Sequence, residues 1–327
     1  MSSTISLVCT VRDEAATIGP LLDSMLAQTR APDEIVVNDC LSRDATPAIV
    51  ERYIAAGHPV RLVRGGHNIP SGRNSAVRAA RGAIVACTDA GLTLDPRWLE
   101  RIVAPIERGE ADIVGGFFRP APQSLFEFAL AATNYPDADE VRAERFLPFG
   151  QSVAFTRVTW EAVGGYPEWA SHCEDLLFDL AVKRRGYRLV FVPDALVHFR
   201  PRENLAAFAR QYYFYGSGDG AADLWHRRYA IRYAAYLGGL ALLIAAVGRP
   251  WLLLLHLLGA AAYCRAPVRR VLRRGAARPV GDRVAAIALV PLLRAVGDLA
   301  KMVGYPRGAL RRLRDAALRA ETEAYRR

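Results

Sequence analysis

Short apolar runs alternate with segments of helical pattern through the first 90 residues, and this alternation restricts the chain to few folds. The apolar runs have the length of buried strands and lie at residues 5–10, 34–39, 60–63 and 83–87. The segments between them are predicted to be helices, at residues 17–28, 46–56 and 71–80. Strands and helices that alternate in this way form βαβ units with right-handed crossovers. We therefore expect an α/β fold with parallel strands in its sheet.

Polar side chains stand at the carboxyl ends of three of these runs, and they are Arg12 to Glu14, Asn38, Asp39 and Asp89. Open α/β sheets bind ligands at this edge. A carboxylate such as Asp89 could hold a ribose hydroxyl there, or a metal bound to a diphosphate. Acids also cap turns or lie solvated in them, so the pattern leaves two interpretations, a nucleotide site and ordinary turns.

The loop at residues 64–72 contains three glycines but matches neither common phosphate-binding motif. It lacks the Lys-Ser/Thr pair that ends a Walker loop, and it lacks the Gly-x-Gly-x-x-Gly spacing of dinucleotide-binding folds. A nucleotidyltransferase acting on a triphosphate is disfavoured for the same reason, because no glycine-rich loop with a lysine is present.

The charge of the chain is unevenly placed. The first 200 residues hold 21 basic and 25 acidic side chains, whereas residues 201–327 hold 22 and 8, and the whole chain carries +10. The chain is also 52% hydrophobic, with a mean hydropathy of +0.07. Basic residues next to apolar segments favour an anionic membrane as partner. Nucleic acid is not expected, because the chain has neither zinc-finger spacing nor an aromatic RNA-binding signature.

The cysteines are odd in number and scattered, mostly within apolar runs, at positions 9, 40, 87, 173 and 264. They are interpreted as small buried hydrophobic residues in a reducing compartment. The first residues lack the basic and long apolar regions of a secretion signal, so we expect no cleaved signal and a cytoplasmic first domain.

Two apolar segments follow, at residues 231–248 and 250–267, with arginines before the first and after the second. Their length and flanks predict a membrane hairpin at about residues 231–267, with both ends in the cytosol. Each apolar core is short, so a re-entrant pair or a buried helical hairpin is the alternative. The amphipathic pattern of residues 283–325 predicts helices that lie among lipid headgroups, or else on the solvated face of a bundle.

Six segments in order resemble the successive motifs of family 2 glycosyltransferases. They lie at residues 5–14, 34–46, 72–74, 87–91, 152–167 and 173–187. The resemblance implies the GT-A fold, with a nucleotide-binding mixed sheet flanked by helices in residues 1–204. Residues 205–327 would then form an all-α, membrane-associated C-terminal region. Residues 117–148 are interpreted as a variable insertion that could shape an acceptor groove.

The resemblance also implies roles on the donor side. Thr10, Val11 and Glu14 would border the nucleoside, Asp39 would accept a hydrogen bond from the base, and Arg73 would lie near the diphosphate. These residues together would bind a nucleotide-diphosphate sugar.

A divalent metal, Mg or Mn, is implied with less support. Asp89 matches the first acid of the family's Asp-x-Asp motif, but Gly91 stands where the second, usually metal-coordinating acid is expected, and Asn38 replaces an acid in the preceding motif. His198 resembles a histidine that some GT-A enzymes use as a metal or diphosphate ligand. A lone histidine after a strand is more often structural, which is the alternative interpretation of His198. On the resemblance, Asp89 and His198 are the expected metal ligands.

The acceptor side falls in two further segments. Glu174 and Asp175 open an apolar-periodic helix, where the helix dipole alone could account for two acids. In the family, the second acid of this pair resembles the general base, and the turn containing Gly165 and Tyr166 belongs to the acceptor side together with Glu174. An inverting transfer needs one such carboxylate to take the proton of the acceptor hydroxyl. Asp175 is the expected base.

The leading hypothesis is an inverting, membrane-bound glycosyltransferase of the cell envelope, with its catalytic domain in the cytoplasm and a lipid-linked or glycan acceptor. The alternative is a catalytically inactive, nucleotide-sugar-binding membrane scaffold, which Gly91 makes plausible. The presence of Asp175 argues for the enzyme, because an inactive binder has no need of a base.

Overall fold

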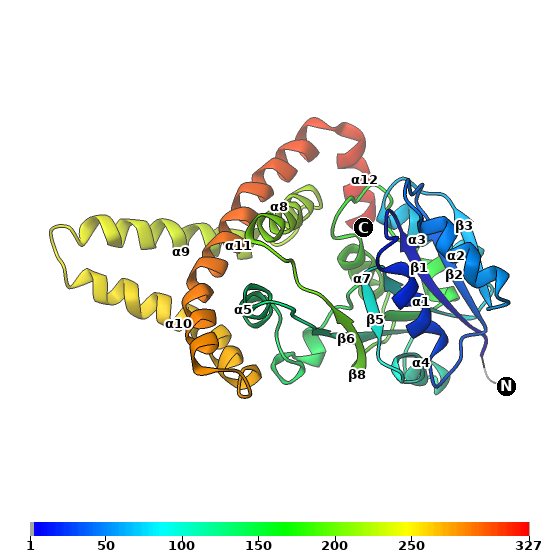
Figure 1. Ribbon diagram of the computed structural model, residues 1–327. Helices are drawn as coiled ribbons and strands as arrows, with labels where there is room; N and C mark the ends of the chain where they lie inside the picture. Colours follow the sequence, from blue (N-terminus) through cyan, green and yellow to red (C-terminus); the bar gives the residue numbers. More distant parts are fainter. Residues whose placement is uncertain (1–2, 327) are drawn as a thin grey trace. The chain divides into compact units, whose positions relative to one another are not determined.

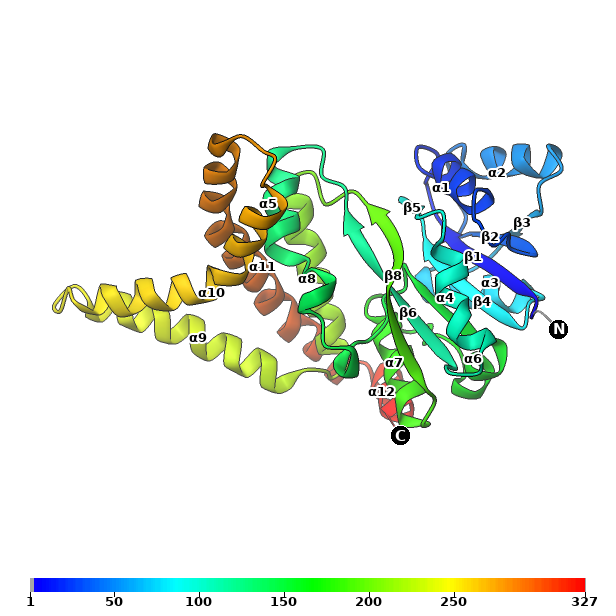
Figure 2. The same cartoon turned by 90° about the horizontal axis from the view of Figure 1, so that it is seen from below.

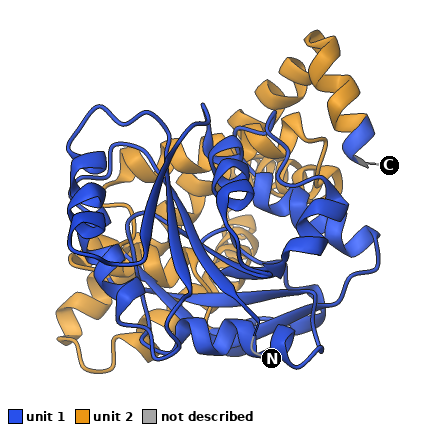
Figure 3. Ribbon diagram, turned by 90° about the vertical axis from the view of Figure 1, so that its right-hand side faces the viewer, with its two compact units in different colours: residues 1–121, 138–199, 324–327 blue, residues 122–137, 200–323 orange. Residues whose placement is uncertain are grey.

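The computed structural model describes residues 3–326, and its contacts divide the chain into two compact units (Figure 3). The first, called here the catalytic unit, comprises residues 1–121, 138–199 and 324–327. The second, called the helical unit, comprises residues 122–137 and 200–323. The contacts thus group residues 122–137 with the helical unit, whereas the sequence interpretation drew a single boundary at residue 204.

The catalytic unit contains an eight-stranded sheet in the order β3-β2-β1-β4-β7-β6-β8-β5. Its first four strands are mutually parallel, as predicted, and they are β1 (Ile5–Val11), β2 (Glu34–Asp39), β3 (Val60–Arg64) and β4 (Ile84–Asp89). Nearly every residue of β1, β2 and β4 is buried. This burial explains why their sequences are continuous apolar runs rather than alternating ones.

The second half of the sheet makes it mixed, as the expected GT-A fold requires. Its strands are β5 (Leu92–Leu94), β6 (Ile113–Pro120), β7 (Val153–Thr156) and β8 (Leu189–Phe199). Strand β7 is antiparallel to both β4 and β6, and β5 is antiparallel to β8. Strand β8 is one continuous element, although the sequence pattern suggested two pieces that ended before His198.

Helices flank this sheet (Figure 1). They are α1 (Ile18–Leu26), α2 (Thr46–Ala55), α3 (Ile69–Ala79), α4 (Trp98–Glu107), α6 (Arg157–Val163) and α7 (Glu174–Arg184). Two short 3-10 helices lie at Ala138–Glu140 and Ala143–Arg145. Helix α7 packs on the sheet through Phe178, whose ring lies 5.3 Å from that of Phe155. This contact fixes the helix that carries Asp175.

The segment at residues 117–148 is more regular than the predicted variable insertion. It includes the end of β6 and helix α5 (Leu125–Asn134), which belongs to the helical unit. Ser124 caps α5, because its hydroxyl oxygen accepts from the backbone N–H of Glu127 at 3.2 Å. Pro122 and Pro136 lie outside the helix, where they do not interrupt it.

The helical unit is built from α5 with α8 (Leu205–Ala221), α9 (His226–Ala245), α10 (Leu252–Arg274), α11 (Val280–Arg314) and most of α12 (Ala316–Arg326). Helices α8 and α11 pack very closely along glycines of both. A Cβ on Gly220 would overlap the carbonyl oxygen of Tyr305, and a Cβ on Gly304 would overlap that of Tyr213. The sequence pattern predicted two separate amphipathic helices here, but α11 is one helix that continues through Pro306.

The two apolar segments form the neighbouring helices α9 and α10, which run beside each other in both views (Figures 1 and 2). In the described part of the chain, no helix is both long enough and apolar enough to cross a bilayer. A membrane crossing needs roughly 20 residues without charge. The uncharged segments of α9 and α10 are shorter, because Arg232, Arg249 and Arg265 bound them. The predicted membrane-crossing hairpin is therefore not supported.

Candidate active site

The register of the sheet brings the predicted donor-side residues to one level at its carboxyl edge. Thr10 of β1 lies opposite Asn38 of β2 on one side and opposite Asp89 of β4 on the other. Val11 lies opposite Asp39. Adjacent strands are about 4.8 Å apart, so Thr10, Asn38 and Asp89 form one row across this edge, and Val11 and Asp39 form the next row on the opposite face. Their role toward a nucleotide stays a prediction.

The loops after β1 and β2 are joined by hydrogen bonds. The backbone N–H of Asp13 donates to the hydroxyl of Ser42 at 2.8 Å, and the N–H of Arg43 donates back to the Asp13 carboxylate at 2.7 Å. Glu14 donates its N–H to Thr46 Oγ1 at 2.8 Å. These bonds hold the predicted nucleoside-bordering segment against the loop that follows Asp39.

Several buried polar atoms at this edge have no hydrogen-bond partner among the described residues. They include Thr10 Oγ1, Asn38 Oδ1 and Thr88 Oγ1. Buried polar groups in native proteins are nearly always bonded, to protein, water or ligand. A polar ligand at this edge could therefore form hydrogen bonds with these atoms.

Arg73 links the end of β4 to the start of α7. Its Nη2 donates to Asp89 Oδ1 at 2.5 Å and its Nη1 donates to Glu174 Oε1 at 2.7 Å, and the side chain is only 4% exposed. Burial alone would lower the pKa of Arg73, but the charges of Asp89 and Glu174 outweigh it and raise that pKa. Both terminal nitrogens are thus bonded to carboxylates in the protein. The predicted contact of Arg73 with a diphosphate stays untested.

Asn74, the next residue, holds the predicted acceptor-side turn. Its Nδ2 donates to the carbonyl of Tyr166 at 2.8 Å, and its Oδ1 accepts from the N–H of Tyr166 at 2.9 Å. Gly165 just before has φ +75°, a left-handed conformation that suits glycine. The sequence analysis missed Asn74, and its position in the Gly-Arg-Asn motif was the only signal for it.

The first turn of α7 gives its two acids different environments. Glu174 is buried against Arg73, and this burial raises its pKa to about 7 although the Arg73 charge opposes the shift. Asp175 is more exposed, and its Oδ2 accepts from the N–H of Gly150 at 3.2 Å. Asp175 is therefore the more accessible of the two carboxylates.

The two expected metal ligands differ in how they are held. His198 lies inside β8 rather than after it, opposite Thr93 of β5 and Arg119 of β6. Burial, with the nearby Arg119 charge, lowers the pKa of His198, so the ring is neutral near pH 7 and able to bind a metal. Asp89 shares one oxygen with Arg73. Among the described residues, no group of three His, Cys, Asp or Glu side chains could hold an ion.

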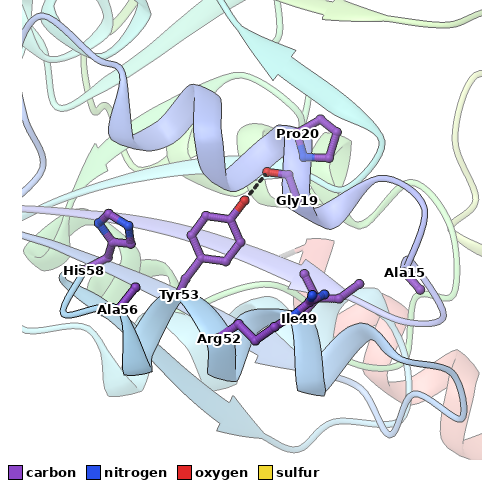
Figure 4. A pocket seen from close by; sticks show the side chains of 8 residues that line it. All are labelled: Ala15, Gly19, Pro20, Ile49, Arg52, Tyr53, Ala56 and His58. Atoms are coloured by element: carbon purple, nitrogen blue, oxygen red, sulfur yellow. Dashed lines mark hydrogen bonds between the residues drawn. The ribbon is translucent and has the colours of Figure 1, made fainter.

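A shallow hollow of about 440 Å³ lies on a different part of the catalytic unit (Figure 4). It is lined by α1 residues such as Gly19 and Pro20 and by α2 residues such as Ile49 and Tyr53. The Tyr53 hydroxyl donates to the carbonyl of Gly19 at 3.2 Å across it. None of its lining residues is a predicted site residue, so the hollow does not mark the candidate donor site.

Asp179, one helical turn after Asp175, is a buried carboxyl group that the sequence analysis overlooked. It is 1% exposed, and its Oδ2 has no hydrogen-bond partner in the described chain. Burial, together with the charge of Asp175, raises the pKa of Asp179 well above its usual range. The carboxyl group therefore favours its protonated form in the folded protein.

We expect Asp179→Asn to stabilise the protein at neutral and alkaline pH. A carboxyl whose folded pKa is raised lowers stability as pH rises above its unfolded value near 3.9, by up to about 1.4 kcal/mol per pH unit until the folded pKa is reached. Asparagine removes this loss, so the gain in melting temperature should grow from pH 5 to pH 8. The exposed Asp194→Asn is the control and should show no such trend. A variant no more stable than the native protein at pH 8 would contradict the burial argument.

Comparison with known proteins places this site in a family. The sequence profile described as "Glycosyl transferase family 2" matches residues 6–159, and that of "Glycosyl transferase family group 2" matches residues 84–296. The second match covers more than half of the chain. Between them the two matches include the carboxyl edge, Arg73, Asp175 and His198.

Individual proteins give the same result. The chain is 25% identical to glycosyltransferase AglE of Haloferax volcanii over 199 residues, which are 59% of this chain and 65% of AglE. It is 30% identical to dodecaprenyl-phosphate galacturonate synthase of Rhizobium johnstonii over 130 residues, which are 37% of this chain and 38% of that enzyme. The alignments thus span less than two thirds of either relative.

The fold is shared with a solved structure, the mannosyltransferase PcManGT from Pyrobaculum calidifontis in complex with GDP-Man and Mn²⁺. The TM-score is 0.56 at 21% identity, and the match covers 97% of this chain and 88% of the other. With the two profile matches, the chain therefore belongs to the family 2 glycosyltransferases.

Proposed function

We propose that the protein transfers a sugar, with inversion, from a nucleotide-diphosphate sugar to a hydroxyl acceptor, and that Asp175 is the general base. The observation that carries this proposal is the bridge made by Arg73, which ties the carboxyl edge at Asp89 to the helix turn that presents Asp175. Arg73 thereby holds the proposed donor-side and acceptor-side residues in fixed positions relative to each other. Such positioning is a large part of what an enzyme supplies to a two-substrate reaction.

The chemical step follows from these positions. Asp175 takes the proton of the acceptor hydroxyl while the acceptor oxygen forms a bond to the anomeric carbon of the donor sugar. The bond from that carbon to the donor phosphate breaks on the opposite face, and the nucleoside diphosphate leaves with the bonding electrons. One base is sufficient, and no covalent sugar–enzyme intermediate is formed.

On the donor side, we assign Thr10, Val11 and Glu14 to the nucleoside and Asp39 to the base. The register of Thr10, Val11 and Asp39 at the sheet edge supports this assignment, as does the hydrogen bond that holds Glu14 against the loop after Asp39. We expect Asp39→Ala and Asp89→Ala each to weaken nucleoside diphosphate binding by about 1.5–3 kcal/mol, the contribution of a hydrogen bond to a charged group. Titration calorimetry measures the change, with Asp194→Asn as the unaffected control. Unchanged affinity in both alanine variants would place the pocket elsewhere.

A divalent metal fits the site only loosely. Asp89 has one oxygen outside its bond to Arg73, and His198 is neutral near pH 7, so these two could contact an ion whose remaining ligands are water and donor phosphates. Mg²⁺ or Mn²⁺ would there neutralise charge on the departing diphosphate.

Because Gly91 removes a usual ligand, we expect metal dependence to be present but modest. Gly91 has φ +75°, a left-handed conformation that glycine adopts readily, and it offers no side-chain oxygen to an ion. Exhaustive chelation should lower the rate of transfer without abolishing it, and added Mn²⁺ should restore it. Titration calorimetry of nucleotide binding with and without Mn²⁺ gives a second readout. A rate unaffected by chelation would refute a metal role.

For the acceptor, we propose a lipid-linked substrate or a growing envelope glycan, met at the cell membrane by a cytoplasmic catalytic unit. The name of the Rhizobium johnstonii relative, which refers to dodecaprenyl phosphate, and the basic helical unit support this choice. The test is release of nucleoside diphosphate from a panel of UDP-, GDP- and dTDP-sugars, with dodecaprenyl phosphate supplied in anionic vesicles. We expect one donor to be turned over faster when the lipid is present.

The second candidate, a catalytically inactive nucleotide-sugar-binding scaffold, is favoured by Gly91 alone. Thermal stabilisation by a nucleotide sugar, without release of nucleoside diphosphate under any acceptor condition, would support it. The approachable carboxylate of Asp175 favours the enzyme.

A further inference from the structure

Helices α9 and α10 expose an apolar surface that nothing in the helical unit covers. We call residues 237–263 the apolar hairpin. Leu237 is 65% exposed, Val247 at the turn is 88% exposed, and Leu257 is 63% exposed. Ile244, Trp251 and Leu254 are each at least 60% exposed as well. The exposed side chains lie on both helices, which pack beside each other.

The base of the apolar hairpin is held in place by a buried carboxylate of α11. Asp298 accepts from Arg232 Nε at 2.8 Å and from the hydroxyl of Tyr236 at 3.0 Å, and it also accepts from the hydroxyl of Tyr263. Arg232 and Tyr236 belong to α9 and Tyr263 belongs to α10. The Asp298 carboxylate thus fixes the positions of both helices. The exposed leucines therefore lie on helices that are held in place by specific hydrogen bonds.

An exposed surface of this kind needs an occupant. Soluble proteins rarely leave large contiguous apolar patches in water, and helices that are apolar on all sides are normally buried in protein or lipid. Within the hairpin, Ala246 and Leu252 are buried near the turn, so the two helices cover only a narrow seam of each other.

The arginines around the hairpin indicate which occupant fits. Some have partners within the unit. Arg232 binds Asp298, and Arg270 and Arg274 donate to carbonyls of α5, namely those of Ala132 and Ala131. These three arginines are structural.

Other arginines near the hairpin are exposed. Arg227, Arg265 and Arg269 at its base and Arg249 at its turn have no ion pair in the described chain. Unpaired guanidinium groups beside apolar side chains match the phosphates and acyl chains of an anionic lipid surface.

We infer that the apolar hairpin lies along the boundary between headgroups and acyl chains in one leaflet of an anionic membrane, with Arg249, Arg265 and Arg269 among the lipid phosphates. The inference rests on the membrane location proposed above, and it names the surface and the depth of the contact. From Leu237 to Val247 the hairpin extends about 15 Å, half of a hydrocarbon core of about 30 Å. Upright insertion would carry Arg249 to the bilayer centre, where a guanidinium is strongly disfavoured. A hairpin that lies along the boundary keeps the arginines of both its ends at the headgroups while its leucines reach the acyl chains.

Vesicle flotation of the full chain tests the lipid partner. We expect binding to vesicles of phosphatidylcholine with 30% phosphatidylglycerol and at least about tenfold weaker binding to phosphatidylcholine alone. Leu254→Asp should lower binding at least tenfold, whereas Val158→Asp, at an equally exposed position of α6, should not. Arg265→Gln with Arg269→Gln should weaken binding to the anionic vesicles, whereas Arg81→Gln with Arg185→Gln, both exposed in the catalytic unit, should not.

Trp251 at the turn reports the depth. We expect a blue shift of its fluorescence on vesicle binding and strongest quenching by lipids brominated near the glycerol end of the acyl chain. Trp251→Phe should lose both signals. Strongest quenching by bromines at the chain end would overturn this shallow, one-leaflet arrangement.

Absence of vesicle binding would overturn the inference altogether, and dimers that Leu254→Asp dissociates would then identify a second copy as the occupant. Either failure leaves the proposed transfer reaction intact. Transfer is assayed separately with a soluble donor, as nucleoside diphosphate release in detergent.

Discussion

Asp175→Asn is expected to lower the rate of sugar transfer by roughly 100-fold to 10,000-fold, the range that a general base supplies. Asparagine keeps the size of the side chain and an oxygen that can accept from the N–H of Gly150. It cannot take the proton of the acceptor hydroxyl. Affinity for the nucleoside diphosphate, measured by titration calorimetry, should stay within a few-fold of the native value because the proposed role of Asp175 is toward the acceptor.

Two variants calibrate this result. Glu161→Gln changes an exposed acid on α6 and should leave turnover unchanged. Glu174→Gln should reduce turnover less than Asp175→Asn, since Glu174 is buried and its part is to bind Arg73. Near-native turnover by pure Asp175→Asn would remove Asp175 from the mechanism.

Arg73→Met is expected to destabilise the catalytic unit by about 3–5 kcal/mol, as does removal of one partner from a buried ion pair. Methionine fills much of the space of the arginine stem but leaves the Glu174 carboxylate, 6% exposed, without its cation. Asp89 loses the same partner. The free energy of unfolding in urea measures the loss.

The matched control for this variant lies on the same helix. Arg78 pairs with Glu168 at 3.1 Å, but its side chain is 61% exposed. Arg78→Met should therefore cost about 0–1 kcal/mol. Adding Glu174→Gln to Arg73→Met should recover part of the lost stability, because a neutral amide replaces the unpaired charge. Equal losses for Arg73→Met and Arg78→Met would contradict the buried bridge.

The first half of the fold could be predicted because its signals are local. Strands β1, β2 and β4 are largely apolar runs that end at polar turns, and the predicted bounds of β2 match the observed Glu34–Asp39. Helix α3 begins two residues before its predicted start, at Ile69, because Asn68 caps it and Pro70 suits its first turn.

The second half could not be predicted in the same way. Strand β5 has only three residues, and the antiparallel strand β7 is paired with β4, which lies some seventy residues earlier in the chain. Such pairing depends on the whole sheet rather than on local pattern.

The candidate site shows the same division. The polar ends of β1, β2 and β4 follow from strand order alone, and their shared edge was predicted. The bridge from Arg73 to Glu174 joins residues 101 positions apart, and the bonds of Asn74 to Tyr166 span 92. The burial of Asp179 likewise depends on how α7 packs on the sheet. Contacts of this kind leave no periodic signal in the sequence.

The C-terminal arginines illustrate a further limit. Composition assigned their charge as a whole to an anionic membrane. The structure divides them, since Arg232, Arg270 and Arg274 bind groups within the helical unit whereas Arg265 and Arg269 have no ion pair in the described chain. Net charge therefore overstates the number of arginines available to lipid.

The anomeric configuration of the transferred sugar tests the central claim most directly. With Asp175 as base and no covalent intermediate, each transfer inverts the anomeric carbon. Proton NMR of the product formed from a donor of known configuration, such as an α-linked UDP-hexose that the protein accepts, reads the outcome from the coupling constant of the anomeric proton. The account predicts a β-linked product throughout the reaction, and an α-linked product would contradict it.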